Sequence, residues 1–271
     1  MSERVAGARG IPLRAILPNA VTALALCFGL TGVRFAIGAE WEKALLAVVF
    51  AGVLDAMDGR IARLLRAQSR FGAELDSLSD VIAFGVAPSV IIFLWSLHDA
   101  PKFGWTVALA LAVCCALRLA RFNSRMDAEE QPHKAAGYFT GIPAPVGAGL
   151  AFVPIYLWFV TGNPLFRAWY VTMPWVLFIA SLMISTVATY SWSSIRLRRS
   201  WRMLAIAGIG LFGAALVTAT WHTLLAISAI YVALLPFSIA SYQRFKRRRA
   251  ARPVPAPGAA TTTDSAGRHE A

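Results

Sequence analysis

Apolar stretches long enough to cross a membrane occupy most of this chain and leave few options for its fold. A helix needs about 20 mostly apolar residues to span the hydrocarbon core of a bilayer. Hydrophobic residues make up 58% and charged residues 15% of the 271 positions, whereas in a soluble domain about half are apolar and about a quarter charged. The sequence therefore predicts an all-α, polytopic membrane helix bundle. About eight transmembrane helices are expected, at residues 16–38, 43–65, 72–97, 103–122, 144–161, 168–190, 203–220 and 222–242.

The basic residues predict how this bundle lies in the membrane. Nearly all of the 26 lysines and arginines fall at the N-terminus, in the connections after the second, fourth and sixth spans, or in the C-terminal segment. Only Lys43, Lys102 and Arg167 fall on the opposite side. Since cytoplasmic loops are enriched in Lys and Arg, we expect both termini in the cytoplasm. Nucleic acid is not an expected partner, because a protein that binds it gathers its basic residues on one soluble face.

Three regions follow from this pattern. We expect a basic cytoplasmic N-terminus at residues 1–14, a transmembrane domain at 15–242, and a cytoplasmic tail at 243–271. Within the transmembrane domain, a catalytic core of about 15–192 carries the motifs described below, and the helices at 203–242 are additional. The tail is basic first and then rich in Pro, Ala and Thr without apolar periodicity, which is typical of a disordered segment.

Four aspartates lie at the predicted cytoplasmic ends of the second and third spans. Asp55 and Asp58 are three residues apart, and Asp76 and Asp80 are four apart, so each pair shares a helix face. The short connection makes the two helices antiparallel neighbours, and all four carboxylates can then converge. Carboxylates are costly near a membrane, and four of them close together repel one another. Bound divalent cations resolve this conflict, and a ligand set made only of oxygens suits Mg²⁺ or Mn²⁺.

Small and basic residues between these aspartates fit a phosphate-bearing ligand. Gly59 and Gly72 let a bulky ligand approach the backbone, and Ala62 keeps the same face shallow. Arg63 can pair with phosphate through two donors. The alternative is structural: interhelical salt bridges between the aspartates and Arg63 or Arg66 that only hold the bundle together.

The full motif is Asp55-x2-Asp58-Gly59-x2-Ala62-Arg63-x8-Gly72-x3-Asp76-x3-Asp80. It resembles the complete signature of the CDP-alcohol phosphotransferases. The resemblance implies an enzyme that transfers a phosphoalcohol unit from a CDP-linked donor to an acceptor hydroxyl and releases CMP. It also implies two divalent cations as cofactors, so the reaction would proceed by two-metal catalysis.

The resemblance further implies roles for individual residues. Asp55 and Asp76 would contact both cations, and Asp58 would contact one. Asp80 would contact the second cation and act as the catalytic general base that deprotonates the acceptor. Contacts to the CDP-lipid are expected from Asn19, Thr22, Gly59, Ala62, Arg63, Ser69 and Gly72. For Asn19 and Thr22 the alternative is capping of a helix that begins after Pro18.

Two further segments bear on the acceptor. They are Arg118-Leu-Ala-Arg121-Phe-Asn123 and Phe139-Thr-Gly-Ile-Pro-Ala-Pro145. Together with the Pro18-Asn-Ala-Val-Thr22 segment, they resemble the membrane-embedded phosphatidylserine synthase branch of the family, which implies CDP-diacylglycerol and L-serine as substrates. A serine carboxylate needs a cationic partner, so the expected acceptor-binding residues are Arg118, Arg121, Asn123 and Lys134. The alternative is that the basic residues only orient the helix ends in the membrane.

The sequence also fits other acceptors and another class of protein. The same chemistry could use glycerol 3-phosphate, choline or inositol phosphate as the acceptor. A cation transporter is an alternative of a different class, with the aspartates along an ion pathway. The resemblance also implies a homodimer. The membrane arrangement predicts a multi-pass protein of the inner (cytoplasmic) membrane, surrounded by membrane lipids, with its active site facing the cytoplasm.

Overall fold

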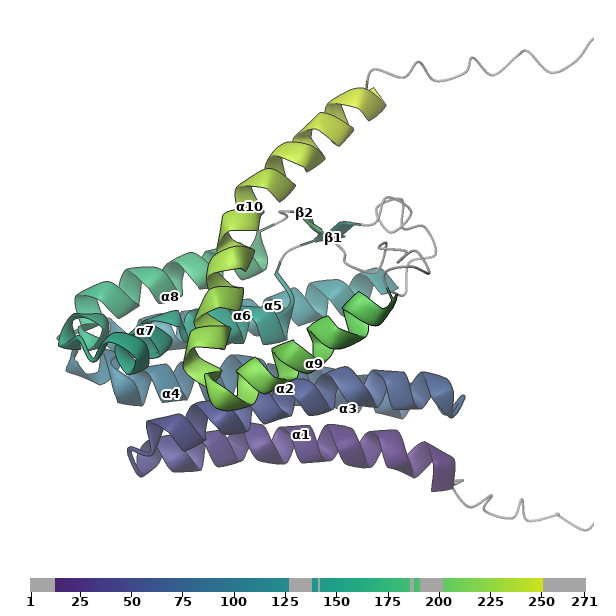
Figure 1. The fold of residues 1–271 in the computed structure, drawn as a ribbon, viewed down its shortest axis with the longest axis horizontal. Helices are drawn as coiled ribbons and strands as arrows, with labels where there is room; N and C mark the ends of the chain where they lie inside the picture. The colour runs from purple at the N-terminus through teal and green to yellow at the C-terminus, as the bar shows by residue number, and fades with distance from the viewer. Residues whose placement is uncertain (1–12, 127–137, 141, 186–187, 191–201, 251–271) are drawn as a thin grey trace, which may run out of the picture.

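The computed structural model describes residues 13–126, 138–140, 142–185, 188–190 and 202–250 (Figure 1). In chain order these residues form α1 (Leu13–Ile37), α2 (Trp41–Leu64), α3 (Arg70–Asp80), the π-helical segment η1 (Val81–Val86), α4 (Ala87–Trp95), the 3-10 helix η2 (Leu97–Asp99), α5 (Gly104–Met126), β1 (Tyr138–Thr140), α6 (Ala144–Ala151), α7 (Val153–Thr161), the 3-10 helix η4 (Pro164–Arg167), α8 (Trp169–Ile184), β2 (Ala188–Tyr190), α9 (Arg202–Thr218) and α10 (Thr220–Ala250). The predicted helical bundle is confirmed, with one short two-stranded ribbon added.

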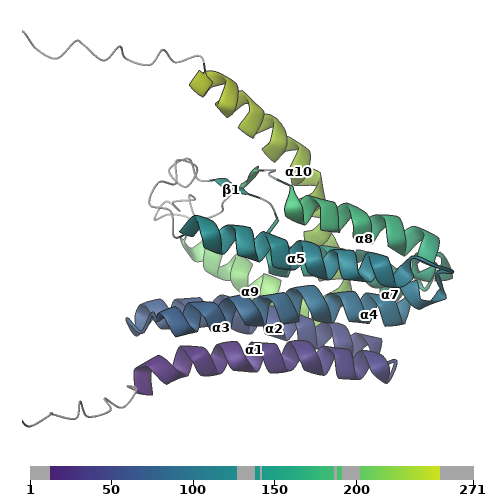
Figure 2. The same cartoon turned by 180° about the vertical axis from the view of Figure 1, so that it is seen from behind.

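The longer helices lie side by side and roughly along one direction. Figures 1 and 2 show α1, α2, the α3–η1–α4 rod and α5 in this arrangement, with α10 crossing the bundle steeply. α1 packs along α2, α5 packs along α8, and α10 contacts α6, α7 and β2. The largest fully buried side chains include Trp95, Tyr156 and Phe84. The core therefore lies between the N-terminal helices and the later ones.

Three of the described helices, or four if a bent pair counts as one span, are long and apolar enough to cross a membrane. Within the described residues these are Ile16–Ile37, Arg70–Trp95 and Gly104–Ser124, and the bent pair Ala144–Ala151 and Val153–Thr161 makes a fourth if it counts as one span. Trp169–Ile184 and Thr220–Leu235 are apolar but shorter. These helices support a membrane protein, while the number of eight spans and the cytoplasmic termini stay predictions.

A tight turn between α2 and α3 reverses the direction of the chain. The Arg66 backbone has φ +50°. The N–H of Arg66 donates to the carbonyl of Arg63, and the N–H of Ala67 donates to that of Ala62, which is the pattern of a Schellman motif. Ser69 then begins α3, accepting a hydrogen bond from the N–H of Gly72 on its side chain at 3.0 Å. The turn reverses the chain, so that α3 packs along α1 and its continuation through η1 and α4 contacts α2.

The fifth predicted span is not one straight helix. α6 and α7 meet at Phe152 with a bend of 40°. Pro154 has no N–H to donate to the carbonyl of Leu150, four residues earlier, so the helical ladder breaks there. The indole Nε1 of Trp175 in α8 donates to that carbonyl instead, at 2.8 Å. The bend is therefore held by a side chain distant in the sequence.

The sixth predicted span is shorter than expected. α8 ends at Ile184, whereas the sequence predicted helix to residue 190. Thr189 and Tyr190, which belong to residue types that favour strands, lie in β2, and β2 pairs antiparallel with β1. The prediction was wrong for this end of the helix. Residues 188–190 form hydrogen bonds with a strand some 50 residues earlier in place of the helical hydrogen bonds that the local sequence favours.

The rod that carries two of the aspartates contains the π-helical segment η1 directly after Asp80. Such segments occur mostly as single turns inside α-helices, and these turns are frequent at functional sites. Neighbouring backbones approach η1 closely: an added Cβ at Gly29 in α1 would lie 2.8 Å from the Ala83 Cα, and one at Gly85 would lie 3.1 Å from the Cys115 Cβ. Small residues thus permit close helix packing around the end of the acidic helix.

Gly29→Ala is expected to destabilise the protein by about 1–3 kcal/mol, the usual cost of an overpacked core. The added methyl group meets backbone in η1, which cannot move without moving Asp80, so activity should fall with stability. Gly213→Ala in α9 is the matched control, because no atom lies within 4 Å of its added Cβ, and the gain in helix propensity should leave Tm equal or higher. Thermal unfolding in detergent measures both, and an equal Tm for the two variants would contradict this packing argument.

Candidate active site

Three carboxylates from two helices converge at one point of the bundle. Asp55 of α2 and Asp76 and Asp80 of α3 each offer a ligand oxygen, and these oxygens lie within 4.8 Å of one another. All three residues are partly buried. Carboxylates at this separation repel strongly unless a cation lies among them. The donor set consists only of carboxylate oxygens and fits a divalent cation such as Mg²⁺ or Mn²⁺.

The fourth aspartate, Asp58, lies close by but outside this group. It is buried, with 5% of its surface exposed, and its Oδ2 accepts a hydrogen bond from the Thr22 hydroxyl at 2.6 Å. The backbone carbonyl of Thr22 accepts a hydrogen bond from the Ser79 hydroxyl at 3.2 Å. Thr22 therefore ties α1 to both acidic helices. The role of Asp58 as a metal ligand stays a prediction.

Asn19, Ser69 and Gly72, three of the residues expected to contact the CDP-lipid, lie together. A Cβ at Gly72 would lie 2.8 Å from the Asn19 Oδ1 and 3.1 Å from the Ser69 Oγ. The structure thus explains this glycine by the close approach of two side chains. Asn19 and Thr22 lie inside α1, which begins at Leu13, so the alternative that they cap a helix after Pro18 is wrong.

The α2 face beside Asp55 is open around Gly59, where an added Cβ would meet no atom within 4 Å. Ala62 follows on α2 with its side chain partly buried, and Arg63 is exposed. The ion pairs among the described residues are Lys43 with Glu40 and His98 with Asp99. Salt bridges between the aspartates and Arg63 or Arg66, the structural alternative, are therefore absent from the described residues.

Arg118 is the basic residue that the structure brings to the acidic cluster. It lies on α5, is partly buried, and interacts electrostatically with Asp80. Arg121 instead donates from Nη1 to the carbonyl of Ile184, at 2.7 Å, and so supports the C-terminal end of α8. Asn123 donates from Nδ2 to the Ser77 hydroxyl of α3 at 2.8 Å. Lys134 lies outside the described residues.

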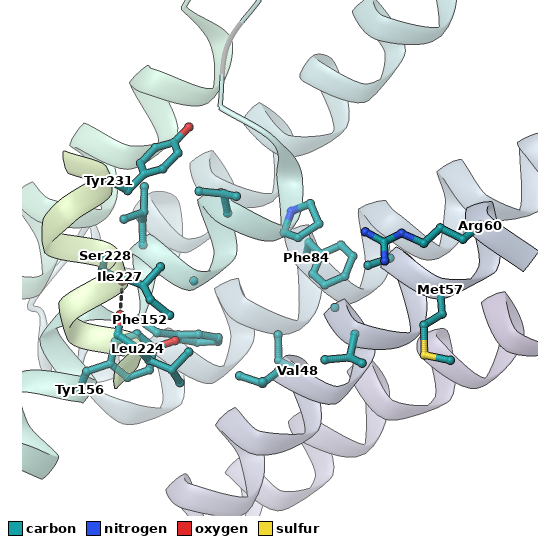
Figure 3. A pocket seen from close by; sticks show the side chains of 18 residues that line it. Val48, Met57, Arg60, Phe84, Phe152, Tyr156, Leu224, Ile227, Ser228 and Tyr231 are labelled. Atoms are coloured by element: carbon teal, nitrogen blue, oxygen red, sulfur yellow. Dashed lines mark hydrogen bonds between the residues drawn. The ribbon is translucent and has the colours of Figure 1, made fainter. Parts of the chain in front are cut away.

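An apolar cavity of about 510 Å³ lies beside the acidic helices, between α2, η1, α6, α7 and α10 (Figure 3). Val53, Met57 and Arg60 line it from the α2 face next to that of Asp55. Val53 and Met57 are 47% and 46% exposed, so the cavity opens on the side of α2 that faces away from the core. Tyr231 of α10 also lines it. No motif in the sequence marks Tyr231, because it is a single tyrosine in an apolar helix.

Comparison with known proteins agrees with this geometry. A model of the CDP-alcohol phosphatidyltransferase family matches residues 15–187, and one described as CDP-alcohol phosphatidyltransferase 2 matches residues 200–236. The chain is 36% identical over 242 residues to a Mycobacterium tuberculosis protein named CDP-diacylglycerol–serine O-phosphatidyltransferase, covering 87% of this chain and 82% of that one.

Proteins of the same name show similar likeness. The one from Mycobacterium leprae is 35% identical over 239 residues, covering 88% of this chain and 79% of that protein. The one from Bacillus subtilis is 33% identical over 152 residues, covering 56% of this chain and 80% of that protein. The protein therefore belongs to the CDP-alcohol phosphatidyltransferase family, as its aspartate motif predicted.

Proposed function

We propose that this enzyme transfers the phosphatidyl group of CDP-diacylglycerol to the hydroxyl of L-serine, giving phosphatidylserine and CMP. The observation that carries the proposal is the cluster of Asp55, Asp76 and Asp80 with Arg118 beside Asp80. The cluster suits a diphosphate substrate held through divalent cations, and the arginine suits the carboxylate of an amino acid. The names of relatives that align with most of the chain support serine as the acceptor.

In the proposed reaction Asp80 takes the proton of the serine hydroxyl as its oxygen attacks the phosphatidyl phosphorus. A new P–O bond forms to serine, the P–O bond to CMP breaks, and CMP leaves with the bonding electrons. Asp55, Asp58, Asp76 and Asp80 would hold two divalent cations, which, when bound, neutralise charge on the diphosphate and on the leaving CMP. Asp80 lies at the end of α3 next to Arg118, where proton acceptor and serine carboxylate can lie side by side.

The lipid donor has room along α2, on the face beside Asp55 and in the neighbouring cavity. The open face at Gly59 would accept the diphosphate, and the exposed Arg63 would pair with it. The adjacent cavity is almost entirely apolar, and its volume and its opening suit an acyl chain that continues into the bilayer. Asn19, Thr22, Ala62, Ser69 and Gly72 would complete the nucleotide-lipid site from α1, α2 and α3.

The membrane arrangement follows the charge pattern of the sequence. We expect eight spans, a core at 15–192 with two added helices at 203–242, and cytoplasmic tails at 1–14 and 243–271. The acidic cluster would then face the cytoplasm from the inner membrane, where serine is available. The expected assembly is a homodimer.

An acceptor assay tests the proposed function. Purified enzyme with CDP-diacylglycerol and Mg²⁺ or Mn²⁺ is expected to release CMP with L-serine, and more slowly or not at all with glycerol 3-phosphate, choline or inositol phosphate. Mass spectrometry of the lipid product identifies the alcohol that was joined. CMP release that depends on another acceptor, with none on serine, would replace serine in the proposal and keep the reaction class.

A further inference from the structure

Two serines lie between Asp76 and Asp80 on α3, and each is bonded to a different helix. The Ser79 hydroxyl donates to a backbone carbonyl of α1 at 3.2 Å, and the Ser77 hydroxyl accepts a hydrogen bond from Nδ2 of Asn123 on α5 at 2.8 Å. Residues two apart on a helix face different ways, so the two bonds hold α3 from different sides. In a helix of only 11 residues, they restrict how far it can turn about its own axis. The directions in which Asp76 and Asp80 point therefore depend on α1 and on α5.

The hydrogen bond from Asn123 to Ser77 has a defined direction. The Ser77 hydroxyl donates its own proton to the carbonyl of Ala73, one turn earlier on α3, at 3.0 Å. A hydroxyl has one donor and two acceptor lone pairs, so its oxygen stays free to accept from the Asn123 amide. The two bonds are compatible and fix the orientation of the hydroxyl. The link between α5 and α3 is partly buried, where hydrogen bonds are stronger than in water.

The end of α5 that carries Asn123 is itself anchored. Two residues earlier, Arg121 donates from Nη1 to the carbonyl of Ile184 at 2.7 Å, and α5 packs along α8. The same helix carries Arg118, the arginine proposed to bind the serine carboxylate. A helix fixed in this way can position its neighbour. The link from Asn123 thus sets the acidic helix α3 against the helix of the proposed serine site.

We infer that Asn123 is a positioning residue that fixes α3 for metal binding and phosphatidyl transfer, rather than a ligand of serine. The inference rests on the proposed function. Without this hydrogen bond α3 keeps its bond to α1 but can turn about it, and Asp76 and Asp80 then move together relative to Asp55. A misplacement of about 1 Å can cost about 10²-fold in rate. An asparagine that only bound serine would act on the affinity for serine instead.

The test compares Asn123→Ala and Ser77→Ala with wild type, as full-length protein in detergent. Either variant should lower kcat about tenfold at saturating serine, because the carboxylates are misplaced, and should leave KM for serine unchanged. Either should also need about fivefold more Mg²⁺ or Mn²⁺ for the same rise in Tm, the effect of losing about one hydrogen bond. Ser77→Thr keeps the hydroxyl and should retain the wild-type kcat and metal response.

Ser181→Ala is the matched control. Ser181 is exposed on α8, and its hydroxyl donates to the carbonyl of Leu177, four residues earlier, at 2.8 Å. The substitution therefore removes the same kind of bond within a helix as Ser77→Ala does, but no bond to another helix. It should match wild type in kcat and in metal response. The double variant Asn123→Ala with Ser77→Ala should be no worse than either single variant, because both remove the same bond.

A higher KM for serine with an unchanged metal response in Asn123→Ala would overturn the inference and make this residue an acceptor ligand. Additive effects in the double variant would overturn it too, as would a lower Tm with kcat and metal response unchanged. A wild-type enzyme that releases no CMP with serine would instead contradict the proposed function. The metal response of Tm needs no serine and would still test the inference, so the two failures are distinguishable.

Discussion

Asp80→Asn is expected to lower the rate of CMP release at least about 1000-fold and to leave most of the affinity for CDP-diacylglycerol intact. Asparagine has nearly the shape of aspartate but cannot take a proton from the serine hydroxyl, and general-base catalysis contributes about 10²–10⁴-fold. Loss of one oxygen ligand from the group around Asp55 and Asp76 adds to the effect. Single-turnover CMP release and binding of the CDP-lipid, measured separately, check the two halves of this prediction.

Glu74→Gln is the matched control for that variant. Glu74 lies on the same helix α3, its side chain is exposed, and it is outside the carboxylate group. The substitution removes one negative charge from the same segment and should leave turnover within about twofold of wild type. Asp80→Asn with near-normal turnover would assign the general base to another residue. Equal losses in both variants would point to a general effect of charge on α3.

Asp76→Asn is expected to abolish turnover and, in metal-free detergent, to keep or raise Tm. Two unit charges 4 Å apart repel by about 4 kcal/mol at an effective dielectric constant of about 20, so removing one carboxylate relieves strain in the apo protein. Wild-type Tm should rise on adding Mg²⁺ or Mn²⁺, by the equivalent of about 2.7 kcal/mol at a concentration about 100 times Kd. The variant should lose most of that rise. Thermal unfolding with and without EDTA measures all of these quantities.

Asp99→Asn serves as the control for the metal prediction. Asp99 pairs with His98 in η2 and has 63% of its side chain exposed, so its substitution removes a carboxylate that takes no part in the cluster. Both its turnover and its Tm response to metal should match those of wild type. Full wild-type turnover in EDTA, or a Tm that does not respond to either cation, would rule out a metal role for Asp55, Asp76 and Asp80.

The convergence of Asp55, Asp76 and Asp80 could be predicted, because it depends on helix periodicity and on one short turn. These are local properties of the sequence. The helical class was predictable for the same reason. The hydrogen bond between Thr22 and Asp58 could not be predicted, because it depends on how α1 packs against α2. A buried carboxylate accepts a hydrogen bond from whichever donor the packing brings close.

The irregular parts of the fold could not be predicted for a related physical reason. Pro154 marks a point where a helix ladder fails, but whether the chain bends there depends on a partner for the freed carbonyl of Leu150, which Trp175 provides from another helix. The ribbon of β1 with β2 likewise joins segments far apart in the chain. Local propensity carries no information on such pairings.

Thr22 joins three helices of the candidate active site through two hydrogen bonds. Its hydroxyl holds Asp58 on α2, and its carbonyl holds Ser79 on α3, one residue before Asp80. Restricting a side chain costs up to about 2 kcal/mol of conformational entropy, and here that loss occurs when the bundle assembles. Cations and substrate bound there would meet an Asp58 carboxylate that is already immobilised, which would favour binding through preorganisation. The helix α1, which contributes none of the three clustered carboxylates, thus restrains the two helices that do.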